Sequence, residues 1–518
     1  MSSEPTIFFG ACLLSLGLTA LMKQFAPFVG LTDKPDGHRK LHGTATPVGG
    51  GVAVFLTSVI VLSAIWLLPN RLQEPLRAGY PDLPALLIGS AIIVLVGLFD
   101  DRFGLRGRDK LVGQIVACST LIFGGLVIEN IQFFGYEFNL GFLAIPLTLF
   151  WLLGAINSLN LLDGIDGLAT MLGIILSCTI AILAAIYCDN TAIAVVAMVF
   201  AGSLIGFLRF NFPPASIFLG DTGSMLIGLV VGALAIRGSL KGPGTVLLTA
   251  PLAVWMLPIL DVVAAIVRRK LTGRSIYATD RGHLHHRLLG FLGTNRRVLA
   301  WVAVSCAITS FATLVSVFSE NDMIAVGTCA AVLLIFVVTG AFGRVELMLL
   351  GTRLKRMSSS FVPTMRPRNA PHESAIRLQG SKQWDVLWHS FLESTRDLEL
   401  FDVRLNVHLP VIGESFHAVW EHPRRRGESE DAWRVDVPLR AFERVVGSVL
   451  ISGTSSHERP VGDQLTRFTD ILVRFESQIE RFIEMENAPL PVPLPLASAP
   501  RSRFPGQDHS AQNSPLGE

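Results

Sequence analysis

The chain has 518 residues, of which 50% are hydrophobic and only 16% are charged, with a formal net charge of +2 and a mean hydropathy of +0.51. This composition excludes an ordinary soluble protein and predicts a polytopic membrane protein. The near-neutral charge gives no support to nucleic-acid binding. All six cysteines lie in or beside apolar runs without C-x-x-C spacing, so we interpret them as small core residues.

Apolar runs of about 17–25 residues, long enough to cross a bilayer, recur up to Gly343 and predict about eleven transmembrane helices. The predicted spans are 6–25, 48–68, 83–99, 111–128, 142–156, 168–187, 192–210, 223–236, 245–267, 298–318 and 323–342. The first run has no basic flank before it and is followed by lysines and arginines. It therefore predicts a retained first span with an external N-terminus, not a cleaved signal.

With this orientation the internal loops carry about seventeen Lys and Arg residues and the external loops about four. The positive-inside rule then places five polar loops on the cytoplasmic face of the membrane. These loops are 33–47, 100–110, 157–167, 209–222 and 268–297. The external segment 131–140 alternates around a glycine and predicts a small hairpin.

The chain changes character after the transmembrane domain, which we assign to residues 1–343. Residues 344–373 form a basic, Pro/Ser-rich linker, and 487–518 form a Pro/Ser-rich tail expected to be disordered. Residues 374–486 predict a small cytoplasmic α+β domain. Its helix at 384–392 and its strands at 401–409, 416–420, 433–437 and 445–451 follow from hydrophobic periodicity.

The last helix of this domain carries apolar residues in steps of three and four. They are Leu465, Phe468, Leu472, Phe475, Ile479 and Phe482. Two interpretations fit the spacing: a helix packed on its own sheet, or a coiled-coil-like seam that joins two copies in a homodimer.

The stretch from Asn157 to Ala169, N-S-L-N-L-L-D-G-I-D-G-L-A, is the most informative in the chain. It puts two amides and two carboxylates between apolar runs at a membrane edge, where ionisable groups are costly and usually functional. A structural interpretation remains open for part of it, because Asp166 could cap the following helix and the glycines could make the turn.

Two further acidic motifs stand at membrane edges. Asp100 and Asp101 end a span at a helix C-terminus, where the macrodipole disfavours negative charge, so a cation is expected to offset them. Asp221 lies in the motif G-D-T-G-S that precedes another span, and it could be an ordinary N-cap. Oxygen ligands from these separate loops would suit Mg²⁺, which takes few protein ligands and several substrate oxygens.

The loop before the tenth span is basic and rich in histidine, running D-R-G-H-L-H-H-R from Asp280. A His-x-His-His cluster could bind a transition metal. The surrounding arginines favour an anionic phosphate instead. The positive-inside rule alone would explain the arginines but not the three histidines.

The ordered set of these motifs resembles the polyprenyl-phosphate N-acetylhexosamine-1-phosphate transferases. The sequence His-Leu-His-His-Arg, the Asp-Arg-Phe after the acidic pair and the loop 33–50 resemble the undecaprenyl-phosphate N-acetylglucosamine-1-phosphate transferase branch. The resemblance covers residues 1–343 and does not extend to the C-terminal domain.

The resemblance implies specific roles. Mg²⁺, for which Mn²⁺ could substitute, would be bound by Asn160 and Asp221, and the catalytic group would comprise Asp100, Asp101 and Asp221. The substrates would contact Lys110, Asn157, Asp163, Asp166, Asn211, Phe218, Arg281, His283, His285 and His286. Among these, Asp166 would contact the nucleotide, and Asn211 and Phe218 would line the uridine pocket.

The implied reaction moves a sugar-1-phosphate, expected to be N-acetylglucosamine-1-phosphate, from a UDP-sugar to undecaprenyl phosphate and releases UMP. This would be the first step of a cell-envelope polysaccharide such as O-antigen or teichoic acid. A general-base role for Asp100 is not required, because a phosphate monoester with a second pKa of about 6 is already largely dianionic at neutral pH. Our hypothesis is that Asp100 and Asp101 orient Lys110 or a metal-bound water.

Three other functions compete with this one, and the sequence argues against two of them. Phospho-N-acetylmuramoyl-pentapeptide transferase activity would use the same kind of site. A membrane transporter or sensor is disfavoured, because the polar residues gather at one membrane face and no internal repeat is visible. A CDP-alcohol phosphatidyltransferase would need its aspartates closer together on helices.

Overall fold

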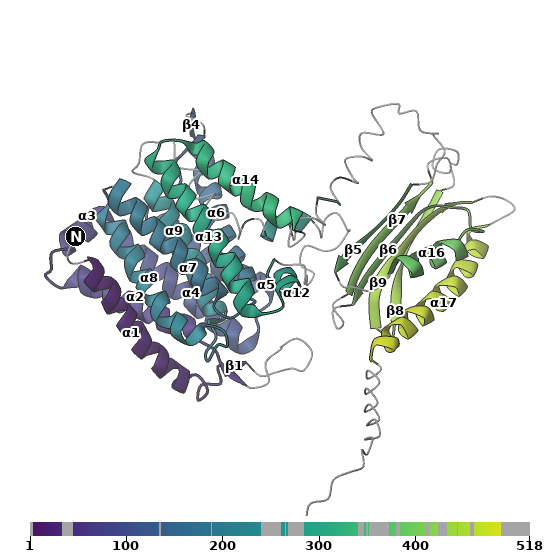
Figure 1. Ribbon diagram of the computed structural model, residues 1–518, viewed down its shortest axis with the longest axis horizontal. Coiled ribbons are helices and arrows are strands. Elements are labelled where there is room, and N and C mark those ends of the chain that lie inside the picture. Colours follow the sequence, from purple (N-terminus) through teal and green to yellow (C-terminus); the bar gives the residue numbers. More distant parts are fainter. Residues whose placement is uncertain are drawn as a thin grey trace, which may run out of the picture.

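The computed structural model describes two bodies of secondary structure, each with its own hydrophobic core (Figure 1). The described residues are 4–33, 45–133, 136–187, 189–239, 284–339, 372–379, 384–409, 414–422, 432–442, 444–455 and 460–487, with a few positions in 259–267 and 347–351. The first body is a helical bundle and the second is a sheet covered by helices. We describe each by itself.

The bundle consists of long apolar helices joined by short connections. Their bounds are α1 Glu4–Phe25, α2 Gly50–Leu67, α3 Gln73–Gly79, α4 Leu83–Phe103, α5 Gly107–Phe123, α6 Ala144–Leu162, α7 Leu168–Ile182, α8 Thr191–Asn211, α9 Gly220–Ser239, α12 Leu284–Leu292, α13 Asn295–Phe318 and α14 Asp322–Val338. A π-helical turn, Leu183–Tyr187, extends α7. Large apolar side chains such as Phe123 and Phe142 are almost fully exposed, as expected of a surface that faces lipid.

Eight of the described helices are long and apolar enough to cross a membrane, compared with the predicted eleven. The spans predicted at 111–128 and 323–342 correspond to α5 and α14, which are helices of only 17 residues. Most of the span predicted at 245–267 lies outside the described residues. The prediction of a multi-pass membrane protein is therefore confirmed. The predicted count of about eleven spans is corrected to eight among the described residues.

Helix α9 is largely buried and packs against α4 and α6 in the bundle. Small residues permit this close packing. A Cβ atom at Gly97 of α4 would lie 2.3 Å from Thr222 Cα, and one at Gly228 of α9 would lie 2.5 Å from Ile156 Cα. The far ends of α4 and α9 are joined by Asp82 and Arg237, whose oxygen and nitrogen lie 2.5 Å apart. The two helices are therefore antiparallel neighbours fixed at that end by an ion pair.

Two short antiparallel hairpins flank the bundle. Strand β1 (Thr32–Asp33) pairs with β2 (Thr46–Pro47), and the next residue, Val48, bridges to Phe218 just before α9. Strand β3 (Asn130–Phe133) pairs with β4 (Tyr136–Asn139), which confirms the hairpin predicted at 131–140. The first hairpin joins the start of α2 to the start of α9.

The C-terminal body is a five-stranded antiparallel sheet in the order β5-β7-β6-β9-β8. Its strands are β5 His372–Gln379, β6 Leu400–Leu409, β7 Glu414–Glu421, β8 Ala432–Ala441 and β9 Arg444–Thr454. Helices α16 (Trp384–Ser394) and α17 (Val461–Asn487) lie on the same face of the sheet (Figure 1). This confirms the small α+β domain. Strand β5 was not predicted; its residues had been assigned to the end of the linker and the start of the domain.

The apolar seam of α17 faces its own sheet. Phe468, Leu472, Phe475 and Ile479 are buried in the core with Trp384, Trp388 and the inner side chains of the strands. The helix-on-sheet interpretation is therefore correct. These four residues are not available as a coiled-coil seam between two copies.

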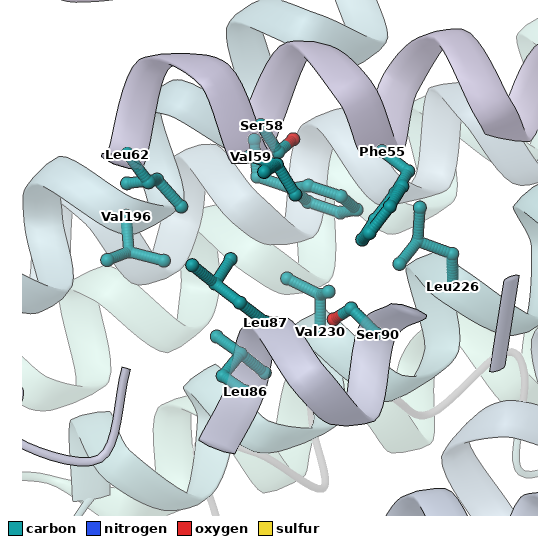
Figure 2. Close-up of a pocket in the computed structure, with 11 residues that line it drawn as sticks. Phe55, Ser58, Val59, Leu62, Leu86, Leu87, Ser90, Val196, Leu226 and Val230 are labelled. Atoms are coloured by element: carbon teal, nitrogen blue, oxygen red, sulfur yellow. The ribbon is translucent and has the colours of Figure 1, made fainter. Parts of the chain in front are cut away.

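A small cavity lies between α2, α4, α8 and α9, well inside the bundle (Figure 2). Its volume is about 20 Å³, and most of its lining side chains are aliphatic or aromatic, with Ser58 and Ser90 as the exceptions. Such a volume admits about one water molecule. The cavity is therefore too small to be a substrate site.

Candidate active site

Four polar side chains, each from a different helix, meet where α4 ends and α9 begins. The Lys110 ammonium on α5 lies 2.5 Å from Asp221 Oδ2 and 2.8 Å from Asp100 Oδ2. It also donates to Asn160 Oδ1 at 3.0 Å. The Asn160 amide in turn donates to Asp221 Oδ1 at 2.7 Å. Asn160 and Asp221 were predicted to share one pocket, and this contact confirms their proximity.

The turn between α4 and α5 brings Lys110 to Asp100. Helix α4 ends at Gly104, whose φ of +68° is accessible to glycine without strain, and α5 starts only three residues later. Asp100 Oδ1 closes this turn by accepting from the Leu105 backbone N–H at 2.7 Å. Its other oxygen pairs with Lys110. The cation that the sequence analysis expected to offset a carboxylate at a helix C-terminus is therefore Lys110.

The Asp101 carboxylate contacts the start of α9 and not Lys110. Its Oδ1 accepts from the Asp221 backbone N–H at 2.8 Å, and its Oδ2 accepts from the Thr222 backbone N–H at 3.1 Å and from the Thr222 hydroxyl at 2.6 Å. These are the hydrogen bonds of an N-cap, supplied from a neighbouring helix. The carboxylate also lies at the positive end of the α9 macrodipole. Our hypothesis was that both aspartates orient Lys110 or a metal-bound water; Asp100 contacts Lys110, whereas the contacts of Asp101 go to α9.

The side-chain amides of Gln114 and Asn157 join α5 to α6, one helical turn after Lys110 along α5. Asn157 donates to Gln114 Oε1 at 2.8 Å, and Gln114 donates back to Asn157 Oδ1 at 3.3 Å. Neither Gln114 nor Ser224 was among the predicted site residues; the Ser224 hydroxyl accepts from the Asn160 amide at 3.0 Å. The spacing could have indicated Gln114, because residues four apart share a helix face and Lys110 lies four positions earlier.

The loop after α6 carries the two carboxylates of the central motif. Asp166 Oδ2 accepts from the Ala215 backbone N–H at 3.0 Å, so it joins this loop to the one before α9 and makes no cap on α7. Asp163 follows the last residue of α6 and is partly buried. Burial, reinforced by the nearby charges of Asp221, Asp101 and Asp166, raises the pKa of the Asp163 carboxyl well above its usual value.

Asn211 and Phe218 lie in the segment that leads into α9. Asn211 is buried; its Oδ1 accepts from the Thr170 hydroxyl at 2.9 Å and its amide donates to the Ile217 carbonyl at 3.1 Å. Both ends of this side chain therefore make contacts within the fold, and its predicted place in the lining of a uridine pocket stays a prediction. Phe218 is partly exposed and its backbone pairs with Pro47 and Gly50.

The profile of glycosyl transferase family 4 matches residues 83–239. This range includes the four residues that we call the Lys110 cluster: Asp100, Lys110, Asn160 and Asp221. A probable undecaprenyl-phosphate N-acetylglucosaminyl 1-phosphate transferase of Bacillus subtilis is 34% identical over 286 residues, covering 55% of this chain and 76% of the relative.

This chain belongs to glycosyl transferase family 4. A decaprenyl-phosphate N-acetylglucosaminephosphotransferase of Mycobacterium leprae is 36% identical, covering 54% of this chain and 75% of the relative. A phospho-N-acetylmuramoyl-pentapeptide-transferase of Shouchella clausii is 31% identical, covering 52% and 82% respectively. Family 4 membership makes the chain an enzyme, and relatives with different sugars leave its own sugar unassigned.

The histidine loop of this family 4 transferase falls largely outside the described residues. Arg281 and His283 are not described, and His285 and His286 lie at the start of α12 without described side chains. Their predicted contact with phosphate or sugar stays a prediction. The described Arg296 of α13 donates to the Pro213 carbonyl at 3.0 Å, which brings this part of the chain to the loop before α9.

The Lys110 cluster fits the cation that the family 4 resemblance implies. Its donors are carboxylate and amide oxygens, the ligands that Mg²⁺ prefers. Three of these oxygens already converge on one positive group, the Lys110 ammonium. Among the described residues no group of three or more His, Cys, Asp or Glu side chains could hold a metal, so Mg²⁺ here would depend on Asn160, Asp221 and substrate oxygens.

Proposed function

We propose that this family 4 transferase moves N-acetylglucosamine-1-phosphate from UDP-N-acetylglucosamine to undecaprenyl phosphate, as the first step of a cell-envelope polysaccharide. The names of the Bacillus subtilis and Mycobacterium leprae relatives support both the sugar and the polyprenyl acceptor. The observation that carries the proposal is the convergence of Asp100, Lys110, Asn160 and Asp221 at the edge of a membrane bundle.

In this reaction an oxygen of the lipid phosphate attacks the sugar-bearing β-phosphorus of the UDP-sugar. The bond from this phosphorus to the oxygen of UMP breaks, and UMP leaves with that electron pair. No protein group is bonded covalently at any stage. The protein must therefore position two anionic substrates and neutralise their charge, which is how most phosphoryl-transfer enzymes act.

We assign the site residues accordingly. Asn160 and Asp221 would hold Mg²⁺, which, when bound, would neutralise charge on the diphosphate. Lys110 would contribute N–H donors to phosphate oxygens. Asp100 would hold Lys110 in place and would not act as a base, because the acceptor phosphate is already largely dianionic at neutral pH.

The remaining residues divide into two groups. We propose that Asp101 and Asn211 position α9 and its preceding loop, since their polar atoms bond within the fold. Asn157 would hold α5 against α6 through Gln114. Asp163, Asp166, Phe218 and the residues of the histidine loop stay our candidates for contacts with the nucleotide and the sugar.

An apolar groove at the same end of the bundle supports a polyprenyl acceptor. It has a volume of about 690 Å³ and is formed by α1, α2 and the end of α4, with Phe25, Leu56 and Leu98 among its lining residues. Leu98 lies two positions before Asp100. An isoprenoid chain in this groove would lie beside the end of α4 that carries Asp100.

The orientation follows from the loop charges of the sequence. We propose that the N-terminus is outside and that the Lys110 cluster opens to the cytoplasm of a bacterial cell, where nucleotide sugars are made. The excess of Lys and Arg in the loops on this face supports this orientation.

The direct test offers purified full-length protein Mg²⁺, undecaprenyl phosphate and a panel of UDP-sugars. We expect UMP release with UDP-N-acetylglucosamine and a lipid product whose mass equals that of undecaprenyl diphosphate N-acetylglucosamine. Release only with UDP-N-acetylmuramoyl-pentapeptide would replace the sugar assignment. No release with any sugar would contradict the proposed reaction.

A further inference from the structure

The position of the Lys110 ammonium has a consequence for how the site accepts a metal ion. Its nitrogen lies 2.5–3.0 Å from one oxygen each of Asp221, Asp100 and Asn160. These three oxygens come from α9, α4 and α6 and converge on this one point. A compact positive group therefore already occupies the centre of the donor set.

A divalent ion and an ammonium cannot both use this centre. Mg²⁺ binds its oxygens at about 2.0–2.1 Å, so it would need the same oxygens at shorter range. Two positive groups at such separation would also repel strongly. Either the ammonium leaves when the ion binds, or the ion binds somewhere else.

We propose that Lys110 is a place-holding cation: in the substrate-free protein its ammonium neutralises Asp100 and Asp221 at the metal position, and it moves off that position when a divalent cation binds. The inference rests on the proposed function, in which Asn160 and Asp221 hold the metal. It goes further by giving the lysine two successive partners, Asp221 first and the anionic substrate afterwards, while Asp100 keeps its ion pair with the lysine.

The surrounding structure allows the side chain to move without the helix. One turn after Lys110, Gln114 exchanges two hydrogen bonds with Asn157 and is itself buried, which fixes α5 to α6. The lysine side chain is 15% exposed, so it has a route away from the centre. Its four-carbon stem has enough freedom to swing the ammonium while the backbone stays in place.

The place-holder predicts an unusual effect of mutation on metal binding. Because the ion must displace the ammonium, the wild-type protein should bind a divalent cation weakly in the absence of nucleotide. The Lys110→Met variant keeps an unbranched side chain that is one heavy atom shorter and removes the charge. It should bind Mn²⁺ more tightly by about tenfold or more, although its transferase activity is reduced.

The experiment measures Mn²⁺ binding to purified full-length protein, without nucleotide, from the electron paramagnetic resonance signal of free Mn²⁺. The control is Arg108→Met, which removes an exposed positive charge two positions earlier. We expect a large gain in affinity for Lys110→Met and at most about a twofold gain for Arg108→Met, because charges in water are screened. Equal gains in both variants, or no gain in Lys110→Met, would overturn the inference.

A second measurement uses the wild-type protein alone. Reductive methylation of Lys110 is quantified by mass spectrometry with and without saturating Mg²⁺, and the exposed Lys23 is the internal control. A released ammonium should be methylated faster with Mg²⁺, while Lys23 is unaffected. Unchanged or slower methylation of Lys110 would overturn the place-holder.

The two assays also separate this inference from the proposed function. If no variant binds Mn²⁺ saturably, the place-holder and the metal assignment both fail, whereas UMP release independently tests the transfer reaction. If UMP is released but Lys110→Met does not gain affinity for Mn²⁺, only the place-holder fails.

Discussion

The Asp101 carboxylate of α4 caps the first turn of α9, accepting from the backbone N–H groups of Asp221 and Thr222 at 2.8 and 3.1 Å. Adjacent aspartates in one motif thus have separate tasks. Asp100 pairs with a lysine, and Asp101 holds the helix that carries Asp221.

Replacing Asp101 tests this division. Asp101→Ala removes the cap and should lower the free energy of unfolding by about 1–2 kcal/mol, in addition to lowering kcat. Asp101→Asn retains one acceptor oxygen and should recover part of both losses. The pH dependence of kcat should not change in either variant. Thermal unfolding in detergent and the pH–rate profile are the measurements; a lost ionisation in the profile would indicate that Asp101 is instead a chemical acid or base.

Asp100 is expected to act through Lys110. Asp100→Asn weakens the ion pair at 2.8 Å, so kcat should fall at every pH, and raising the pH should not restore it. The matched control is Asp109→Asn, which removes an exposed carboxylate in the first turn of α5 and should keep wild-type activity. Full recovery of the Asp100→Asn rate at high pH would instead assign Asp100 as the base that deprotonates the lipid phosphate.

Close packing at Gly51 is expected to set the position of Asp221. A Cβ atom at Gly51 would lie 2.3 Å from the Gly223 backbone nitrogen, so Gly51→Ala must displace the start of α9. We expect destabilisation of about 1–3 kcal/mol and a loss of activity. The control is Gly154→Ala on α6, where no atom lies within 4 Å of the added Cβ. Equal thermal stability and activity for the two variants would show that this packing does not matter.

Asp163 gives a pH-dependent prediction. Because burial raises the pKa of this carboxyl in the folded protein, the folded state loses stability as pH rises from the pKa of the unfolded chain towards the raised pKa, and no stability is lost below the unfolded pKa. Asp163→Asn should therefore unfold at a higher temperature than wild type near pH 8, with the difference shrinking as pH falls towards about 4. Thermal unfolding across this range is the measurement. A constant difference, or a destabilised variant at pH 8, would contradict the prediction.

The C-terminal domain is expected to be dispensable for chemistry. Its core is separate from that of the bundle, and the family 4 match ends at residue 239. A chain ending at residue 371 should release UMP at a rate within about twofold of the full chain when both are assayed in detergent. Loss of most activity in a folded, truncated protein would show that the domain contributes to the site.

Sequence patterns predicted the helical bundle, the hairpin 131–140 and most of the α+β domain, because periodicity reports local structure. Motif order also predicted that Asn160 and Asp221 meet. The separate contacts of Asp100 and Asp101 could not be predicted, since they depend on how α4 packs against α9 through Gly97. The contacts of Asn211 with Thr170 and Ile217 could not be predicted either, since sequence alone does not show which partners a polar side chain finds.

The central claim is that the Lys110, Asp100, Asn160 and Asp221 cluster is the site of phosphoryl transfer. Its most direct test compares UMP release from UDP-N-acetylglucosamine, with Mg²⁺ and undecaprenyl phosphate, by wild-type protein and by Asp221→Asn, each checked for folding. We predict UMP release by the wild type and a fall of about 100-fold or more in the variant. A folded Asp221→Asn protein that releases UMP at the wild-type rate would contradict the account.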